Sequence, residues 1–320
     1  MADLISIAFA CDDLYTKHVA VVMQSIFANA ASEDRHEFHV LTMGITPESE
    51  MRLVEVATSG GATMLVHRVD PQLLAGFTVT YVTLDSYIRL LLPDVLPNHD
   101  KVLYLDADLI VMDSFRELWN TNIENFAAAA ARDGMTITKG PDLEHFEAFN
   151  FPKDHIYFNA GVLLLNLKVL REMHLLERVK VWAQKNSHLM QHNDQDALNV
   201  ILAGKIVNCH LRWNLQAPLI APIKLGWKCS QEHEEAVAEP AIIHYVTNRK
   251  PWRKEFKLPY QSLYFKYLAQ TPWKEDNIDP LTADIFWQRC QEELEWGRKL
   301  VMSKIRRLIG RRFILSDDPN

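Results

Sequence analysis

Lys101-Val-Leu-Tyr-Leu-Asp-Ala-Asp-Leu-Ile-Val111 is the part of the sequence that best reveals how the chain is built. An apolar run of strand length meets two aspartates one residue apart, and the chain then becomes apolar again. Acids within an apolar run are costly to bury unless a partner compensates them. In open α/β sheets, ligands bind beyond the carboxyl ends of the strands. We therefore predict a buried strand over residues 101–105 that presents Asp106 and Asp108 to a ligand.

The two aspartates point to a metal ion. Carboxylates so close together repel each other unless a cation lies between them. Mg²⁺ and Mn²⁺ prefer hard oxygen ligands and can bridge to a diphosphate. His244 lies in another apolar run, residues 241–245, and imidazole is a good ligand for Mn²⁺ beside carboxylates. Taken singly, Asp-x-Asp also arises by chance, and a lone histidine in such a run can be an ordinary core residue.

Strand-like and helix-like segments alternate along the rest of the chain, which predicts an α/β fold with a parallel sheet and covering helices. Thr46 and Pro47 are typical of a helix start, and Pro93 is expected to close another helix. The expected strands are 4–10, 38–43, 63–66, 127–131 and 160–167. The expected helices are 17–30, 47–57, 87–92 and one from about 168 to 185, with a loop or lid over 135–157 and irregular packing over 250–280.

The composition of the 320-residue chain is that of an ordinary globular protein, with 48% hydrophobic and 23% charged residues. Its net charge of -7 argues against nucleic acid as a partner. The four cysteines form no CxxC pair, and the N-terminus lacks the basic start of a signal peptide. No uncharged stretch approaches the ~20 apolar residues of a membrane span. We therefore expect a reduced, cytoplasmic protein.

The C-terminal segment is strongly basic. Residues 298–312 carry seven basic residues and no acid, which leaves -14 for the rest of the chain. Val301, Ile305, Leu308 and Ile309 would fall on one helical face, with the basic residues mostly on the other. This pattern predicts an amphipathic helix that binds an anionic membrane surface peripherally, at the inner face of the cytoplasmic membrane. The alternative is that its apolar face packs on the protein body.

Six short motifs together resemble the bacterial members of glycosyltransferase family 8, and among them the lipopolysaccharide and lipooligosaccharide galactosyl- and glucosyltransferases. They occur in the family's order over roughly residues 3–255. The motifs are Phe9-Ala-Cys-Asp-Asp-Leu-Tyr15, Ser86-Tyr-Ile-Arg-Leu90, the aspartate motif above, Tyr157-Phe-Asn-Ala-Gly-Val-Leu-Leu-Leu-Asn166, Asn193-Asp-Gln-Asp-Ala-Leu-Asn199, and His244-Tyr through Lys250-Pro-Trp252.

The resemblance implies a GT-A fold, a single Rossmann-like nucleotide-sugar-binding domain with a mainly parallel central sheet. It assigns residues 1–255 to the catalytic domain and leaves 256–320 as a helical, basic C-terminal extension. It also implies a role for each matching residue. Mn²⁺, with Mg²⁺ as the alternative, would be bound by Asp106, Asp108 and His244. The donor would be contacted by Asp12, Arg89, Asp106, Asp133, Asn159 and Lys250, and the anomeric carbon would face Asp194 and Gln195.

The resemblance further implies that a hexose moves from UDP-galactose or UDP-glucose to a saccharide acceptor, with retention of configuration. The acceptor would be lipid-linked, such as the lipopolysaccharide core. Because the amide of Gln195 is a poor nucleophile, front-face attack is favoured over a covalent intermediate. Two alternatives stay open: the same chemistry on a capsule or protein-linked acceptor, and a nucleotide-sugar-binding paralogue without turnover. A nucleotidyltransferase should show a glycine-rich N-terminal loop, and residues 8–17 contain no glycine.

Overall fold

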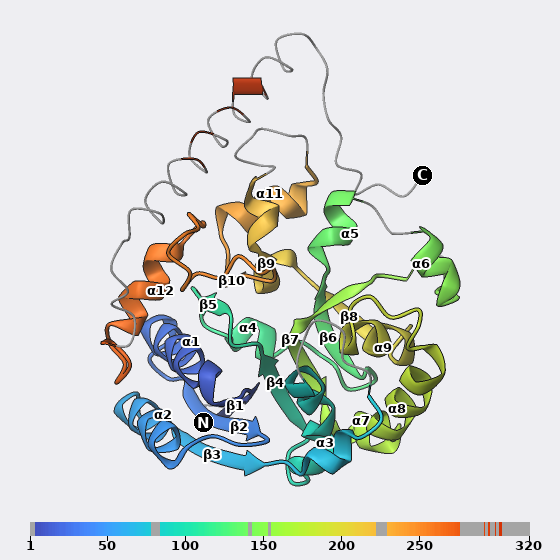
Figure 1. Ribbon diagram of the computed structural model, residues 1–320, viewed down its shortest axis with the longest axis horizontal. Coiled ribbons are helices and arrows are strands. Elements are labelled where there is room, and N and C mark those ends of the chain that lie inside the picture. The colour runs from blue at the N-terminus through green and yellow to red at the C-terminus, as the bar shows by residue number, and fades with distance from the viewer. Residues whose placement is uncertain are drawn as a thin grey trace.

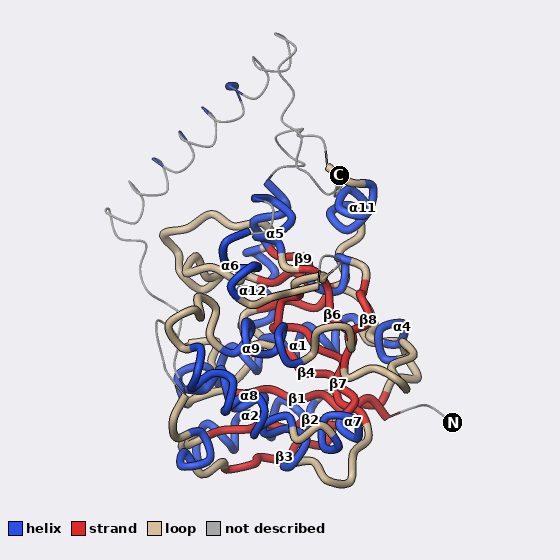
Figure 2. Tube along the Cα trace, turned by 90° about the vertical axis from the view of Figure 1, so that its right-hand side faces the viewer, coloured by secondary structure: helices blue, strands red, loops and turns tan. Residues whose placement is uncertain are grey.

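The computed structural model describes residues 4–77, 84–139, 143–152, 155–221 and 229–275, together with the single residues 291, 294, 298, 301 and 302. A seven-stranded sheet has the order β3-β2-β1-β4-β7-β6-β8, and a three-stranded sheet has the order β5-β10-β9. Figure 2 shows the large sheet from β3 at the bottom toward β6 and β8, with β9 beyond them. The strands are β1 Leu4–Ala10, β2 Arg35–Thr42, β3 Thr63–Arg68, β4 Lys101–Leu105, β5 Leu109–Val111, β6 Ala128–Arg132, β7 Phe158–Asn166, β8 Ile206–Cys209, β9 Leu215–Gln216 and β10 Ile242–His244.

The predicted α/β class and mainly parallel sheet are confirmed. Strands β1, β2, β3 and β4 pair in parallel, as do β6 and β8. Strand β7 runs antiparallel to both of its neighbours, β4 and β6. All nine residues of β7 are buried, because both faces of the sheet are covered there. Such a run indicates a buried strand but carries no information about its direction.

Helices cover both faces of the large sheet (Figure 1). The α-helices are α1 Thr16–Asn29, α2 Pro47–Ser59, α3 Leu92–Val95, α4 Arg116–Trp119, α5 Gly134–Lys139, α6 Leu143–Ala148, α7 Leu167–Glu172, α8 Leu175–Asn186, α9 Asp194–Ile201, α11 Gln231–Ala238 and α12 Gln261–Leu268. Short 3-10 helices span Asp13–Tyr15, Pro71–Leu74, Leu84–Leu91, Leu211–Asn214 and Ala217–Leu219. As predicted, Thr46 caps α2 by accepting from the backbone N–H of Ser49, with Pro47 in the first turn.

Four local predictions need correction. Pro93 does not end a helix, because the 3-10 helix Leu84–Leu91 leads directly into α3. Pro93 lies in the first turn of α3, where the backbone N–H has no hydrogen-bond partner within the helix. The predicted loop 135–157 contains α5 and α6, and the irregular region 250–280 contains α12. The single helix expected up to residue 185 is divided into α7 and α8 at His174, which has a left-handed φ of 51°.

Successive side chains of the central strands point to opposite faces of the sheet and belong to two hydrophobic cores, one on each side. Ile7 and Phe9 of β1 pack on one side of the sheet, with Val19 of α1 in the same cluster. Ala8 of β1 and Tyr104 of β4 belong to the core on the other side. Because side chains alternate along a strand, burial on both faces makes each strand read as an almost continuous apolar run.

Helix α12 packs against α1, and the hydroxyl of Tyr264 lies 2.7 Å from Nδ1 of His18. Tyr264, Tyr267 and Trp273 are buried in the same core as α1. The predicted boundary at residue 255 stays a prediction, as does the amphipathic tail over 298–312. Most of that tail lies outside the described residues, which include only Arg298, Val301 and Met302 from it. Among the helices that the structure describes, none has the length and hydropathy of a membrane span.

Candidate active site

The two aspartates lie beyond the carboxyl end of β4, at the edge where the two sheets meet. Strand β10 pairs antiparallel with β5, so that His244 lies opposite Leu109, immediately after Asp108. The N–H of Tyr245 donates to the carbonyl of Asp108 at 2.9 Å, and the N–H of Asp106 donates to the carbonyl of Gly161 at 2.8 Å. The small sheet therefore brings a histidine that is 136 residues away in sequence onto the aspartate pair.

Asp106, Asp108 and His244 offer ligand atoms that all lie within 4.8 Å of one another. Nε2 of His244 lies 3.1 Å from Oδ1 of Asp108 and 3.7 Å from Oδ2 of Asp106. The histidine side chain is 3% exposed, whereas Asp106 is 25% exposed and thus open to a ligand. The structure therefore brings together the three residues that the sequence predicts as metal ligands.

The protonation of His244 follows from a chain of hydrogen bonds anchored on a backbone donor. The N–H of Gly161 donates to Oδ1 of Asn159 at 3.0 Å, which fixes that oxygen as an acceptor. Nδ2 of Asn214 donates to the same oxygen at 2.9 Å, so Oδ1 of Asn214 faces Nδ1 of His244 at 2.8 Å. Nδ1 must therefore carry the proton. In the neutral ring, the Nε2 lone pair then faces two carboxylates, an arrangement that needs a cation between them.

Gly161 leaves the space in which these ligands meet. A Cβ at this position would lie 2.2 Å from Cε1 of His244 and 2.6 Å from Oδ2 of Asp106. Both neighbours are tied down by hydrogen bonds, so neither can move away easily. Only glycine allows β7 to approach the site this closely. The donor set, the orientation of the imidazole and this space all fit a divalent metal ion.

Two cations flank the ligands. Nζ of Lys250 pairs with Oδ2 of Asp108 and donates to the carbonyl of Tyr245. Burial acts to raise the pKa of Asp108, but the ammonium of Lys250 beside it outweighs burial and holds that pKa well below its usual value. Arg89 pairs with Oδ1 of Asp106 at 3.0 Å, and its guanidinium lies 4.5 Å from the ring centre of Tyr104.

Arg89 also links the aspartate pair to Asp194. Its Nε lies 3.1 Å from Oδ2 of Asp194, and its NH1 donates to the carbonyl of Ala160. Burial raises the pKa of Asp194 to about 6, although Arg89 works in the opposite direction. The arginine is 8% exposed, and burial of its charge requires both carboxylates as partners.

Asp133, Asn159 and Gln195 form a third group beside Arg89. Oε1 of Gln195 accepts from the N–H of Ala160 at 3.1 Å and from Nδ2 of Asn159 at 3.0 Å. Nδ2 of Asn159 also donates to Asp133 at 3.2 Å. Since Oε1 accepts from a backbone N–H, the Gln195 amide has one defined orientation, with its NH₂ 3.4 Å from Asp133.

Asp12 lies two residues beyond the end of β1, next to β4 in the sheet, and so belongs to the same edge. Its carboxylate accepts from the N–H of Tyr15 at 2.9 Å and caps the 3-10 helix Asp13–Tyr15. Trp252 stacks on His18 of α1 and makes a T-shaped, edge-to-face contact with Tyr15, which holds the segment carrying Lys250 against the same part of the fold.

Sequence reasoning missed three residues of the site. Gly161 and Tyr104 lie within the quoted motifs, and the hydroxyl of Tyr104 donates to Asp106 at 2.8 Å. A glycine inside a buried strand is a signal of close approach that could have been used. Asn214, the fully buried last residue of the 3-10 helix Leu211–Asn214, gives no such signal in the sequence.

Comparisons with known proteins agree with this geometry. Residues 6–255 match the profile of Glycosyl transferase family 8. General stress protein A of Bacillus subtilis strain 168 is 27% identical over 282 residues, covering 85% of this chain and 95% of that protein. Lipopolysaccharide 1,3-galactosyltransferase of Salmonella typhimurium strain LT2 is 26% identical over 294 residues, covering 88% and 83%.

A solved structure shares the fold. The galactosyltransferase LgtC, in complex with donor and acceptor sugar analogues, superimposes with a TM-score of 0.76 at 26% identity, covering 85% of this chain and 99% of that one. The predicted GT-A fold and the resemblance to family 8 are thereby confirmed. The profile match extends over most of the chain and contains every residue of the site described above. The chain belongs to glycosyl transferase family 8 and is a glycosyltransferase.

Proposed function

We propose that this glycosyltransferase transfers galactose or glucose from a UDP-sugar to a saccharide acceptor, with Mn²⁺ held by Asp106, Asp108 and His244. The observation that carries the proposal is the position of His244: its Nε2 lies 3.1 Å from Asp108 and 3.7 Å from Asp106, while its Nδ1 lies 2.8 Å from the amide oxygen of Asn214. Mn²⁺ accepts both oxygen and imidazole ligands, and Mg²⁺ is the alternative. When bound, the ion supplies positive charge to the departing diphosphate.

Lys250 and Arg89 are proposed to stabilise the same leaving group, the diphosphate of UDP. Lys250 lies beside Asp108, and its ammonium can move from that carboxylate to a diphosphate oxygen as the donor binds. Charge on UDP grows as the glycosidic bond breaks, so a fixed cation stabilises the transition state more than the ground state. Arg89, buried behind Asp106, holds that carboxylate in place through an ion pair and is proposed to reach the donor sugar and phosphate.

Asp133 and Asn159 are proposed to bind hydroxyls of the donor sugar, and Asp12 the uridine. A carboxylate and an amide held together by hydrogen bonds can accept from and donate to vicinal hydroxyls. Asp12 stands at the same edge of the sheet, beyond β1. Each of these contacts is expected to tighten donor binding rather than to perform chemistry.

Asp194 and Gln195 are proposed to face the anomeric carbon. Asp194 is buried and paired with Arg89, and the amide of Gln195 is oriented by the N–H of Ala160. An amide oxygen fixed in this way can stabilise positive charge on an oxocarbenium-like carbon but is a poor nucleophile. This arrangement favours front-face attack by the acceptor, with retention of the anomeric configuration.

The proposed acceptor is a lipid-linked saccharide such as the lipopolysaccharide core. Support comes from the 1,3-galactosyltransferase relative, whose acceptor is a lipopolysaccharide, and from the basic segment 298–312, which would hold the enzyme at the inner face of the cytoplasmic membrane. Galactose and glucose differ at one hydroxyl, and the residues that would read it, Asp133 and Asn159, can hydrogen-bond to either epimer.

The test is release of UDP from UDP-galactose and UDP-glucose in separate reactions with Mn²⁺, with and without EDTA and a lipopolysaccharide acceptor. We expect metal-dependent release from one donor and faster release with the correct acceptor. Binding of UDP without release from either donor would refute the proposed reaction and favour binding without turnover. The anomeric configuration of the product, read by NMR, tests retention.

A further inference from the structure

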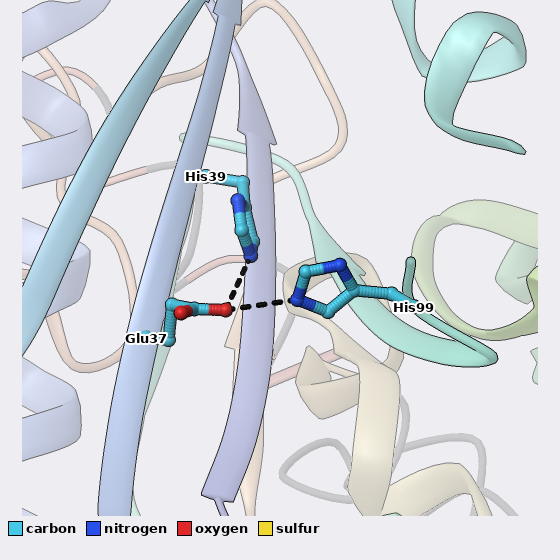
Figure 3. A group of neighbouring side chains, drawn as sticks. All are labelled: Glu37, His39 and His99. Carbon is cyan, nitrogen blue, oxygen red and sulfur yellow. Dashed lines mark hydrogen bonds and ion pairs between the residues drawn. The ribbon is translucent and has the colours of Figure 1, made fainter. Parts of the chain in front are cut away.

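A second group of metal-binding residue types lies away from the active site. Glu37 and His39 belong to β2, and His99 lies just before β4. Figure 3 shows the two imidazoles converging on one carboxylate oxygen: Nε2 of His39 and Nε2 of His99 each lie 2.9 Å from Oε1 of Glu37. The three residues offer ligand atoms within 4.8 Å of one another.

Rigid elements hold these side chains. Glu37 and His39 are two residues apart on a strand and therefore share one face of the sheet. The backbone of His99 is fixed by Arg171 of α7, whose guanidinium donates to the carbonyls of Pro93, Leu96 and His99 at 3.0–3.2 Å. The group is therefore assembled before any ligand binds, which keeps the entropic cost of binding low.

The residue types of the group suit a transition metal. Imidazole nitrogens and carboxylate oxygens are ligands that Zn²⁺ accepts in proteins.

His67 of β3 completes the surroundings of His39. Its Nε2 lies 3.1 Å from Nδ1 of His39. Coordination through Nε2 requires the ring proton of His39 on Nδ1, where His67 can accept it. Histidines that bind metals commonly donate their second N–H to such a partner. Nδ1 of His99 is buried and has no hydrogen-bond partner among the described residues, so a proton moved there breaks no existing bond.

We propose that Glu37, His39 and His99 bind a divalent transition metal ion such as Zn²⁺, at a site separate from the active site. Ligand atoms on tetrahedral zinc, with bonds of about 2.0–2.1 Å, stand about 3.3 Å apart, so the 2.9 Å contacts need to widen by only about 0.4 Å. Glu37 and His99 are 19% and 28% exposed, which leaves water access to the site.

The proposed zinc site is separate from the active site, but strand β4 connects the two. His99 precedes β4 and Asp106 follows it, so the seven residue steps from one to the other span up to about 23 Å as extended chain. A metal there would tie β2 to the segment that leads into β4. It would therefore stabilise the folded enzyme without touching the donor, and unfolding temperature should rise with Zn²⁺ concentration.

The experiment is a titration of the tag-free full-length chain with Zn²⁺ in competition with a fluorescent chelator. An Asp106→Asn/Asp108→Asn background removes binding at the active site. We expect one Zn²⁺ per chain in that background, and at least ten-fold weaker binding when His99→Gln is added. Co²⁺ in place of Zn²⁺ should show the visible absorption of a four-coordinate ion, which the additional substitution abolishes.

His188→Gln is the matched control, because His188 is an exposed histidine outside the group and should leave Zn²⁺ binding unchanged. Glu37→Gln is a second variant that keeps the shape of the side chain and should weaken binding as well. Failure of the background protein to bind stoichiometric Zn²⁺ would overturn the proposal. Equal binding by the His99→Gln and His188→Gln variants would overturn it too, and would leave the group as a hydrogen-bonded network only.

Discussion

Nδ1 of His244 donates a 2.8 Å hydrogen bond to Oδ1 of Asn214, and this bond turns the other nitrogen of the ring toward Asp106 and Asp108. The orientation of the Asn214 amide is itself set by Asn159, which accepts from the N–H of Gly161. A backbone donor thus determines, through two amides, which nitrogen of the imidazole is available to a metal. The proposed metal site depends on this chain of hydrogen bonds, the relay from Gly161 through Asn159 and Asn214 to His244, as well as on its three proposed ligands.

Replacement of Asn214 tests the relay. Asn214→Ala removes the acceptor for Nδ1–H, so the ring can adopt the other tautomer and turn its proton toward the aspartates. Loss of such a partner commonly lowers metal affinity 10- to 100-fold. We expect the Mn²⁺ concentration that gives half-maximal UDP release to rise by about this factor. Asn208→Ala, at an exposed position on β8, should leave it unchanged. Equal metal dependence in the two variants would contradict the relay.

Gly161→Ala should abolish activity through the metal site. The added Cβ would lie 2.2 Å from Cε1 of His244 and 2.6 Å from Oδ2 of Asp106, so one of these ligands must move. Displacement by about 1 Å can cost on the order of 100-fold in rate. Gly44→Ala is the matched control, since nothing lies within 4 Å of a Cβ there. Assays at several Mn²⁺ concentrations would separate lost metal binding from lost turnover, and wild-type kinetics in Gly161→Ala would argue against the described packing.

Arg89→Met should destabilise the protein strongly. It leaves Asp106 and Asp194 without their shared cation, and removal of one partner from a buried ion pair costs about 3–5 kcal/mol. The pKa of Asp194, about 6 in the native enzyme, should rise further. Urea unfolding at pH 7 measures the loss. Arg52→Met, which breaks a more exposed pair with Glu48, should cost less than about 1 kcal/mol. Similar costs for the two variants would mean that the Arg89 pairs contribute little.

His18 should make stability depend on pH. Burial lowers its pKa to about 3, compared with 6.5 in the unfolded chain. Between these values the unfolded state binds a proton that the native state does not, so stability falls as pH falls from about 6.5 toward 3. One such group contributes a slope of up to about 1.4 kcal/mol per pH unit. Urea unfolding at pH 6 and 5 should show a shallower slope for His18→Gln than for the wild type, whereas His188→Gln is the control. Identical slopes in all three proteins would refute this assignment.

The basic segment 298–312 should bind anionic membranes. Change of Lys304, Arg306, Arg307 and Arg311 to glutamine removes four charges, each of which contributes on the order of 1 kcal/mol near an anionic leaflet. We expect sedimentation with phosphatidylserine-containing vesicles to fall and UDP release to stay the same. Neutral vesicles control for non-specific binding. Partitioning that the change leaves intact would favour a tail that packs on the protein.

Much of the fold follows from local patterns in the sequence. Short apolar runs with turn residues between them predict β1, β4 and β6 closely, and Thr46 with Pro47 predicts the start of α2. The direction of β7 could not be predicted. Because both of its faces are buried, its sequence shows no alternation of apolar and polar residues, which would be typical of an antiparallel strand. The helix α12 could not be predicted, because the proline and aromatic residues around it obscure its helical pattern in the sequence. Its position is set by packing on α1 rather than by helix propensity.

The site was predictable where its residues lie inside motifs and unpredictable where they are joined only by folding. Asp106 and Asp108 are visible in the chain itself, whereas their link to His244 depends on the pairing of β5 with β10. Asn214 and Gly161 contribute through the orientation of the His244 ring and the close approach of β7. Neither the orientation nor the distance can be derived from the sequence alone. The same limit applies to Glu37, His39 and His99, whose convergence is a property of the folded sheet.

Direct Mn²⁺ binding is the sharpest test of the metal site. Mn²⁺ is titrated into the wild-type enzyme and an Asp108→Asn variant in the presence of UDP, and the unbound ion is measured by electron paramagnetic resonance. We predict one Mn²⁺ per wild-type chain and at least ten-fold weaker binding by the variant. Mn²⁺ binding that is absent from the wild type, or equal in the two proteins, would contradict the assignment of Asp106, Asp108 and His244 as the ligands.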